Sequence, residues 1–392
     1  MSIGKTIATS LIMGAGRMAV NGASRALRGT PAPPVSDPLE GWATPDDLAR
    51  YAYEPSSFYL GQVDPFHHGL NFEVGLPRVR GDFDDRHVFV VAGNSGGKGT
   101  SIILQNCIRW PGGLAVIDPK GQAASYTAMR RGTAEAAKGT GTEVRRFLGQ
   151  EVAILDPFGM VEGPAKVYRV NYNPLRAINV KDSASGWTRK IKHIADMSVK
   201  DGEGSTGASD HFNGNLRIFL AGIIERVMCT RAPWSEKTLP KCSKHLWRNL
   251  GWDKFGNVEK DEDGNTVDHR ITDEDGLVPW LQRYVDKAPN GGAGFAQRAL
   301  VVMKEIGEEE WGSMRSTMAN KLSWMIDPDL QKHLADSDFS LRRVVQNNGS
   351  VFIVVHPDLL GDVSEWLRVI VRQIIQAKSD RGPMKPGELQ TL

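Results

Sequence analysis

A glycine-rich run from Ala92 to Thr100, with the sequence Ala-Gly-Asn-Ser-Gly-Gly-Lys-Gly-Thr, has the residue types of a phosphate-binding loop. Glycines let successive backbone N–H groups turn toward a β-phosphate at the positive end of the following helix. Gly97 leaves room for that phosphate, and Lys98 supplies a cation that bridges the β- and γ-phosphates. The run predicts an ATP site whose ligands come from Gly93, Asn94, Ser95, Gly96, Gly97, Lys98, Gly99, Thr100 and Ser101.

The loop departs from the strict G-x-x-x-x-G-K-[ST] pattern at two positions. Ala92 stands at the first glycine position, and Gly99 stands where the pattern has a hydroxyl. Thr100 and Ser101 are then the remaining hydroxyls for Mg²⁺, and Thr100 is the nearer of the two. A glycine-rich turn between a strand and a helix also occurs without a ligand. Whether this run binds phosphate therefore depends on the strands and helices predicted around it.

The elements expected around the loop are buried strands that alternate with helices. His87–Ala92 and Leu114–Asp118 are apolar runs typical of strands buried on both faces. A helix from Gly99 to Trp110 separates them, with Ile102, Ile103 and Ile108 expected to face inward. A helical segment, Ala123–Arg131, precedes a third strand at Val152–Asp156. Strand, loop, helix and strand form a βαβ unit, which predicts a parallel sheet with ligands at its carboxyl edge.

Asp118 and Lys120 come directly after the second of these strands, at that edge. One interpretation places Asp118 near the nucleotide metal or has it orient a water molecule, while Lys120 contacts phosphate or a neighbouring subunit. The other interpretation is a tight turn with a surface lysine. Leu114–Asp118 is not interpreted as a Walker B strand, because no second acid follows and the strand comes directly after the loop helix.

Five segments are predicted along the chain. Residues 1–40 form a basic tail and a proline-rich linker, 41–85 a small α+β segment and 86–178 the first part of a nucleotide-binding domain; 179–347 form an all-α insertion and 348–392 the second part of that domain. A helix is expected to begin at Thr44, and small antiparallel strands are expected within residues 58–80. Later helices are expected at Phe212–Met228, Trp311–Ile326 and Val363–Lys378, and a last buried strand at Ser350–Val355.

Composition excludes several classes of protein. The 392 residues, 40% hydrophobic and 24% charged, can fill two or three domains, which excludes disorder throughout. The net charge of +2 means that nucleic acid or an anionic membrane must be met by a local patch. Three cysteines without zinc spacing indicate inert thiols in a reducing compartment. The apolar stretch Thr6–Gly16 is too short to span a bilayer, and with Arg17 it predicts either a basic amphipathic helix at a membrane or a disordered tail.

One segment of the insertion mixes an aromatic residue with cations. It comprises Trp187, Arg189, Lys190, Lys192 and His193. Stacking on an aromatic ring beside cations suits single-stranded DNA. The alternative is an ordinary helix with Trp187 in the core and its cations solvated.

Taken in order, the motifs resemble those of the conjugative type IV coupling proteins of the TraG/VirD family, which are relatives of the FtsK and HerA motors. They are Ala92–Thr100, Asp118-Pro-Lys-Gly, Leu155-Asp-Pro-Phe158, Asn173-Pro-Leu175, His211-Phe212 and Asp338-Phe339, and the match starts at about Gly41. The family tolerates both departures in the loop. The resemblance implies an α/β fold with a RecA/FtsK-like P-loop parallel sheet, an all-α insertion, and ATP with Mg²⁺ as cofactors. Lys98 and Asp118 are the catalytic candidates, with Thr100 on the metal.

The resemblance also implies partners. A complete member of the family is a hexameric, ATP-driven pump that recruits single-stranded DNA with its relaxase to a type IV secretion channel through the all-α domain. The expected location is cytoplasmic, with peripheral contact to the inner membrane through the N-terminal tail. Paired transmembrane helices and a later strand ending in Asp-Glu are expected to be missing, so the sheet is incomplete at the C-terminus and hydrolysis of ATP is an open question. The alternative function is a non-catalytic nucleotide-binding substrate receptor or adaptor.

Overall fold

The computed structural model describes residues 45–55, 57–63, 72–76, 88–93, 96–202, 207–247, 262, 276–288 and 293–382. The predictions for the tail 1–40 and for the loop residues Asn94 and Ser95 lie outside the described residues. Backbone contacts divide the chain into two compact units, one of residues 1–53 and 62–77 and the other of residues 54–61 and 78–392.

The smaller unit holds α2 (Pro45–Ala49) and β2 (Glu73–Gly75). Its described segments are tied by backbone hydrogen bonds, because the Tyr53 N–H donates to the Glu73 carbonyl and the Gly75 N–H donates to the Tyr51 carbonyl, each at 2.8 Å. A further short strand, β1, covers Tyr59–Gln62. The predicted short helix after Thr44 and the short strands within residues 58–80 are confirmed.

The larger unit is built on a three-stranded parallel sheet. Its strands are β3 (Leu114–Asp118), β4 (Val152–Leu155) and β5 (Ser350–Val354), in the order β3-β5-β4. Leu114 and Val152 both lie opposite Ser350, so the three strands start in register. The central strand comes last in the sequence. The helical insertion therefore interrupts the sheet, as predicted.

Side chains of β5 alternate between two hydrophobic cores, one on each face of the sheet. Val351 and Ile353 belong to the core that also holds Trp366 of α16 (Ser364–Ser379). Phe352 and Val354 belong to the core that also holds Ala124 of α5 (Gln122–Arg131). All five residues of β5 are buried. Helices on both faces explain why the strand is a continuous apolar run instead of an alternating one.

The strand predicted at His87–Ala92 is not formed. Residues 88–93 have no regular secondary structure, and the side chains of Phe89 and Val91 are 90% and 79% exposed. An apolar run becomes a buried strand only when neighbouring strands and helices cover it. No described strand pairs with residues 88–93, so their composition alone does not make them a strand.

The helix after the loop begins with a π-helical turn, η1 (Gly99–Ile103), and continues as α4 (Leu104–Arg109). The prediction that Ile103 faces inward is wrong, since its side chain is 48% exposed. The buried residues are instead Asn106 and Cys107. The Asn106 side chain accepts a hydrogen bond from the Tyr59 N–H at 2.8 Å and donates one to the Tyr59 carbonyl at 2.9 Å. It thereby satisfies both backbone groups of this residue of β1, as a residue of a paired strand would.

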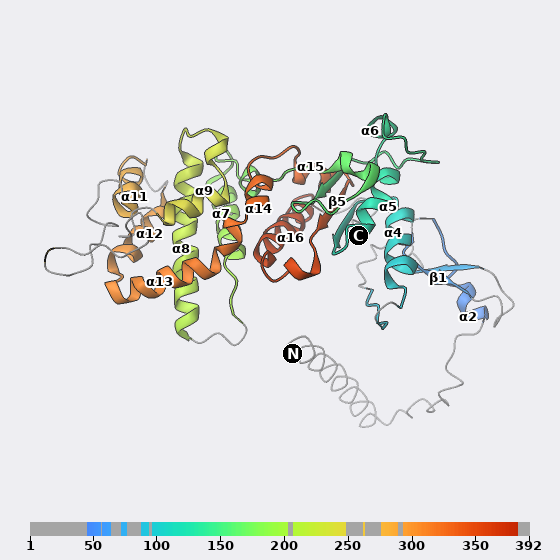
Figure 1. Cartoon of the computed structure of the whole chain (residues 1–392), viewed down its shortest axis with the longest axis horizontal. Coiled ribbons are helices and arrows are strands. Elements are labelled where there is room, and N and C mark those ends of the chain that lie inside the picture. The colour runs from blue at the N-terminus through green and yellow to red at the C-terminus, as the bar shows by residue number, and fades with distance from the viewer. Residues whose placement is uncertain are drawn as a thin grey trace, which may run out of the picture. The chain divides into compact units, whose positions relative to one another are not determined.

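All regular secondary structure among the described residues of the insertion is helical (Figure 1). Its elements are α7 (Ala184–Ser198), α8 (Gly207–Cys229), η4 (Trp234–Glu236), α9 (Leu239–Leu246), α11 (Leu277–Val285), α12 (Gly294–Glu305), α13 (Glu308–Lys321), η5 (Ser323–Ile326), α14 (Pro328–His333) and α15 (Leu341–Gln346). The central helix is α8, which contacts α7, α9, α11, α12 and α13. The remaining short elements are α6 (Ala134–Ala137), η2 (Gly163–Tyr168), η3 (Pro174–Ala177) and η6 (Pro357–Leu359).

The aromatic residue of the predicted DNA patch is buried. Trp187 is 8% exposed and belongs to the core between α7 and its neighbours. Lys190 pairs with Asp182 at 3.3 Å, and Lys192 pairs with Asp196. The Trp187 ring is therefore not available for base stacking, and the alternative prediction of a helix with Trp187 in the core is confirmed.

A buried carboxylate joins α8 to α12. Glu225 is 1% exposed, and its Oε2 accepts the Ala296 N–H at 2.8 Å in the first turn of α12. The helices approach closely there, because a Cβ added at Gly222 would lie 2.8 Å from the Cβ of Ala299. Burial raises the pKa of Glu225 to about 7, against the opposing effect of the backbone N–H donors.

A Glu225→Gln variant is expected to change how stability depends on pH. Because the folded pKa lies above the usual 4.5, the folded chain holds this proton more tightly, and the free energy of unfolding falls as pH rises from about 4.5 through about 7. Glutamine keeps the acceptor oxygen without the charge. At pH 8 the variant should be more stable than the parent by about 1–3 kcal/mol, with little difference at pH 5, in urea unfolding. Glu305→Gln, on the exposed end of α12, is the control, and equal pH profiles for parent and Glu225→Gln would contradict the assignment.

Candidate nucleotide-binding site

The glycine-rich loop closes on itself through its lysine. The Lys98 ammonium donates to the carbonyls of Ala92 at 2.7 Å and Gly93 at 2.8 Å. The Gly96 N–H also donates to the Gly93 carbonyl, at 3.1 Å. The Lys98 ammonium therefore lies against the loop backbone, and Lys98 stands at the N-cap, directly before the helix that begins at Gly99. The sequence predicted a phosphate-binding cation at this residue.

Two glycines of the loop occupy positions that a side chain would fill. Gly97 has a φ of +77°, in the left-handed region that favours glycine. A Cβ at Gly96 would lie 3.0 Å from the Gly93 carbonyl oxygen, and one at Gly97 would lie 3.2 Å from the Ser101 hydroxyl. The space beside these glycines is bounded by the loop backbone and by the hydroxyls at the start of the helix. N–H groups in the first turn of a helix generally lack a partner within the helix itself. This arrangement fits a phosphate group.

Thr100 and Ser101 start the helix beside this turn. The Thr100 hydroxyl donates to the Gly97 carbonyl at 3.1 Å, and the Ser101 N–H donates to the same carbonyl at 2.8 Å. Within the described residues, no group of three or more His, Cys, Asp and Glu side chains is placed to hold a metal ion. A Mg²⁺ ion here would need phosphate oxygens among its ligands, as is usual for this ion at nucleotide sites.

Asp118 ends β3 and caps the next helix. Its Oδ2 accepts the Ala124 N–H at 2.9 Å, and its Oδ1 accepts the Lys120 N–H at 3.4 Å. The side chain is buried, whereas Lys120 is exposed at the tip of the turn. Gly121 completes the turn with a φ of +65°. Both carboxylate oxygens therefore hold backbone N–H groups, and no hydrogen bond or ion pair between described residues links Asp118 to the loop.

A second turn of the same type follows β4, at the motif Leu155-Asp-Pro-Phe158, whose role the sequence did not indicate. Asp156 accepts the N–H groups of Met160 and Val161, each at 2.9 Å, and pairs with Arg169 at 3.2 Å. Gly159 has a φ of +73°, like the glycine of the first turn. The repeated motif Asp-Pro-x-Gly, at residues 118–121 and again at 156–159, indicates in the sequence that both strands end in the same kind of turn. These two turns shape the carboxyl edge of the sheet.

The loop helix is held in place by one buried arginine, Arg131, which no sequence motif indicates. Arg131 is fully buried at the end of α5. Its guanidinium donates to the carbonyls of Cys107 at 2.7 Å, Trp110 at 2.9 Å and Gly112 at 2.6 Å, and to the Ser350 hydroxyl at 2.6 Å. Burial lowers the pKa of Arg131 to about 10, so the side chain keeps its charge at neutral pH. It links the end of the loop helix to the central strand.

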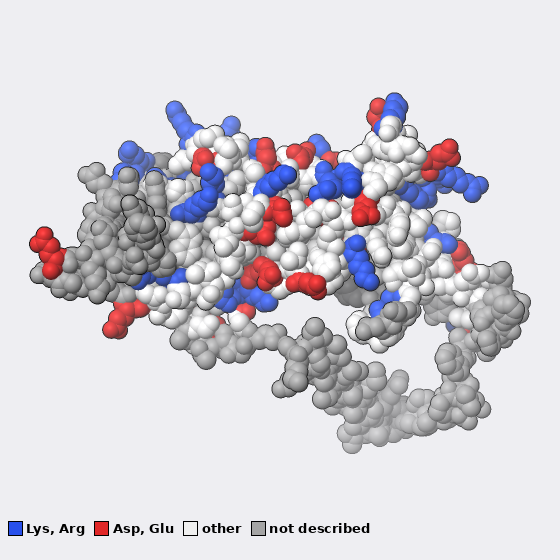
Figure 2. Space-filling model, viewed as in Figure 1, with Lys and Arg blue, Asp and Glu red and all other residues white. Residues whose placement is uncertain are grey.

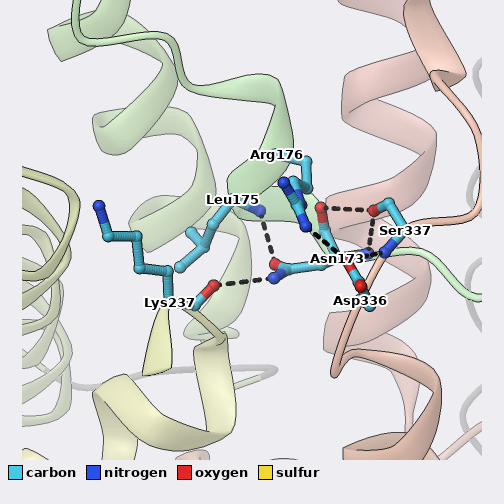
Figure 3. A network of polar contacts seen from close by, with 6 residues as sticks. All are labelled: Asn173, Leu175, Arg176, Lys237, Asp336 and Ser337. Carbon is cyan, nitrogen blue, oxygen red and sulfur yellow. Dashed lines mark hydrogen bonds and ion pairs between the residues drawn. The ribbon is translucent and has the colours of Figure 1, made fainter. Parts of the chain in front are cut away.

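The two connections between the sheet and the insertion meet at a polar network (Figure 3). Asn173 is fully buried, its side-chain N–H donates to the Lys237 carbonyl at 2.8 Å, and its Oδ1 accepts the Leu175 N–H at 3.0 Å. The Asn173 N–H donates to the Ser337 hydroxyl at 2.8 Å. Residues 164 positions apart are thereby joined. The Asn-Pro motif is a clamp where the chain leaves and re-enters the sheet region.

Charges of both signs are mixed on the face of the molecule shown in Figure 2. On the face shown in Figure 2, basic and acidic side chains alternate over the described elements without forming a broad field of one sign. No helix among the described residues is long and apolar enough to cross a bilayer.

The three cysteines are free thiols with raised pKa values. Burial raises the pKa of the Cys107 thiol to about 11 and also raises the pKa values of Cys229 and Cys242, so these thiols stay protonated at neutral pH.

A parallel sheet, a glycine-rich loop at a helix start and a helical insertion define an α/β P-loop-type fold. The chain belongs to the family of type IV secretory system conjugative DNA transfer proteins, whose model matches residues 49–392. The resemblance to the TraG/VirD coupling proteins is thereby confirmed.

Individual relatives agree with the family. The chain is 33% identical over 316 residues to the conjugal transfer protein TraG of Rhizobium radiobacter, which covers 80% of this chain and 41% of that protein. It is 34% identical over 304 residues to TraG of Agrobacterium fabrum, covering 77% and 38%. The chain thus spans about two fifths of the length of these relatives. Among solved structures, the plasmid coupling protein TrwB with a non-hydrolysable ATP analogue matches with a TM-score of 0.40 and 14% identity, over 75% of this chain and 53% of TrwB.

Proposed function

We propose that this chain is a nucleotide-binding part of a conjugative coupling protein, with ATP and Mg²⁺ at the loop Gly93–Ser101. The observation that carries the proposal is the loop geometry, in which Lys98 and the backbone of Gly96 and Gly97 face one turn at the start of a helix. Backbone N–H groups and a helix start favour phosphate, and the lysine supplies the cation that a triphosphate needs.

Each loop residue has a separate task in this proposal. The Lys98 ammonium exchanges the carbonyls of Ala92 and Gly93 for β- and γ-phosphate oxygens, which are stronger acceptors because they are charged. The Thr100 hydroxyl is the first candidate for Mg²⁺ and Ser101 the second. Bound Mg²⁺ would neutralise phosphate charge there. Asp118 ends β3 and Lys120 is exposed in the turn after it, and both remain candidates, for water orientation and phosphate contact respectively.

The wider function follows from the family. We infer that residues 179–347 recruit a DNA and relaxase substrate, that residues 86–178 and 348–392 form the nucleotide-binding domain, and that a hexamer delivers the substrate to a type IV secretion channel at the inner membrane. Membership of the conjugative DNA transfer family supports this inference. A charge of +2 means that DNA must be held by a local patch, and the buried Trp187 excludes base stacking on its ring.

The alternative is a nucleotide-binding receptor that does not turn over. One observation favours it for this polypeptide: both oxygens of Asp118 already hold backbone N–H groups. Steady hydrolysis of ATP by the purified chain, lost in Asp118→Asn while ATP binding is kept, would exclude the receptor. ATP binding without turnover would support it.

The nucleotide site is tested by a Lys98→Ala variant. ATP affinity should fall at least tenfold, or about 1.4 kcal/mol, because the backbone alone cannot balance the triphosphate charge. Isothermal titration calorimetry with Mg²⁺ and ATP measures it. Lys138→Ala removes an exposed lysine elsewhere and should bind as the parent does. Equal affinities for parent and Lys98→Ala would remove the loop from the proposal.

A further inference from the structure

A cavity of about 220 Å³ lies where the insertion meets the sheet region. Its walls come from four places: the connection that leaves the sheet at Tyr172–Asp182, helix α7, the start of α15 and helix α16. It is separate from the glycine-rich loop, none of whose described residues lines it. The cavity adjoins the Asn173 network, because Arg176 takes part in both.

One side of the cavity is apolar. Ile194, Leu341, Val369 and Ala377 line it, and each of these residues is at most 5% exposed. Three of them, Ile194, Leu341 and Ala377, belong to one hydrophobic core to which α7, α15 and α16 contribute. A ligand that fills this side therefore gains by placing a small aliphatic group there.

The other side carries cations, two of which are already paired. Arg176 binds Asp336 at 2.6 Å, and Lys190 binds Asp182 at 3.3 Å. These pairs balance their own charge. They shape the wall and leave little attraction for a ligand.

Two further arginines line the cavity without a carboxylate partner among the described residues, Arg342 on α15 and Arg372 on α16. Among the residues that the structure describes, the Arg372 guanidinium has one hydrogen-bond partner, the His193 ring nitrogen at 3.4 Å. Burial and the neighbouring Arg372 lower the pKa of His193, so the ring is neutral at neutral pH and accepts this contact. The remaining lining acid, Asp380, receives the Gln376 amide at 2.6 Å. Arg342 and Arg372 together with Asp380 therefore leave one positive charge in the cavity, which a ligand with one negative charge would balance.

We propose that this cavity binds the C-terminal carboxylate of a peptide whose last residue is aliphatic. A guanidinium matches a planar carboxylate with two parallel hydrogen bonds, and Arg372 and Arg342 approach the cavity from different helices. Asp380 lines the same cavity, so a dianionic phosphate meets more repulsion than a carboxylate carrying one charge. The aliphatic side chain occupies the wall of Ile194, Leu341 and Val369. The site stands independently of the nucleotide proposal.

The test uses N-acetyl-leucine, which carries both features, and N-acetyl-leucine amide, which keeps the side chain and lacks the charge. Saturation-transfer difference NMR with the full chain should show binding of the acid at least tenfold tighter than that of the amide. Arg372→Gln should weaken binding of the acid at least tenfold. Arg189→Gln, on the solvent side of α7, is the matched control and should bind as the parent does.

A second variant guards against loss of folding. Arg342 is exposed, so Arg342→Gln should fold as the parent does by circular dichroism and still weaken binding of the acid. Equal binding of acid and amide would overturn the proposal. Unchanged binding of the acid in both Arg372→Gln and Arg342→Gln would also overturn it. Displacement of N-acetyl-leucine by inorganic phosphate at a lower concentration than by acetate would overturn it as well.

Discussion

An Arg131→Met variant is expected to lose about 3–5 kcal/mol of folding free energy. Arg131 is fully buried and satisfies three backbone carbonyls, those of Cys107, Trp110 and Gly112, together with the Ser350 hydroxyl. Methionine fills much of the volume but donates to none of them. Buried acceptors left without donors cost more than the hydrogen bonds contribute when they are made. The midpoint of urea unfolding, followed by circular dichroism, measures the loss.

Two controls separate geometry from charge. No carboxylate among the described residues pairs with Arg131, so the charge as such stabilises little. Arg131→Lys keeps the charge but lacks the planar fork, and should recover only a minor part of the loss. Arg145→Met removes an exposed arginine from the same region and should change stability by less than about 0.5 kcal/mol. A midpoint for Arg131→Met within error of the parent would contradict the anchoring role.

The second large effect is expected for Asn173→Ala, at about 2–3 kcal/mol. Alanine leaves the Lys237 carbonyl without its donor and the Leu175 N–H without its acceptor, in a place that is fully buried. The loss should loosen the junction before the sheet unfolds, because the network joins the two connections to the insertion (Figure 3). Hydrogen exchange should therefore rise first at residues 171–177 and 335–340, and global unfolding in urea gives the magnitude.

The aspartate variant sharpens this test. Asn173→Asp keeps the acceptor for Leu175 but turns the donor toward Lys237 into a second acceptor, so it should be at least as destabilising at neutral pH. Asn179→Ala, on the exposed part of the same connection, should cost less than about 0.5 kcal/mol. A loss for Asn173→Ala no greater than that of Asn179→Ala would show that the network does not clamp the junction.

Much of the fold was predictable because local pattern and tertiary context agree. The strands β3, β4 and β5 are apolar runs that the structure buries between two cores, so the sequence pattern and the outcome coincide. Residues 88–91 have the same composition, yet Phe89 is 90% exposed. An apolar run shows that a segment could form a buried strand. Whether it does so depends on neighbouring strands that pair with it and cover it.

The site was predictable to the extent that it is local. Lys98, Gly96 and Gly97 lie within one turn, so their spacing determines their arrangement. Asp118 could be assigned to the sheet edge, but its capping contacts with Ala124 depend on how the following turn folds. Arg131 and the Ser350 hydroxyl lie 219 residues apart, and no spacing rule connects such a pair. The same holds for the cavity between the insertion and the sheet region, here called the junction cavity. Its aliphatic wall and its arginines are brought together only by tertiary packing.

The central claim is that the backbone of the loop holds the phosphates of a nucleotide. Hydrogen exchange of the full chain, measured by mass spectrometry with and without Mg²⁺ and ATP, tests it most directly. Exchange should slow at the N–H groups of residues 96–101 in the parent, and at an ATP concentration near the parent's Kd it should slow much less in Lys98→Ala, while α8 and α12 serve as internal references. Protection confined to the junction cavity, or none at residues 96–101 at saturating ATP, would contradict the account.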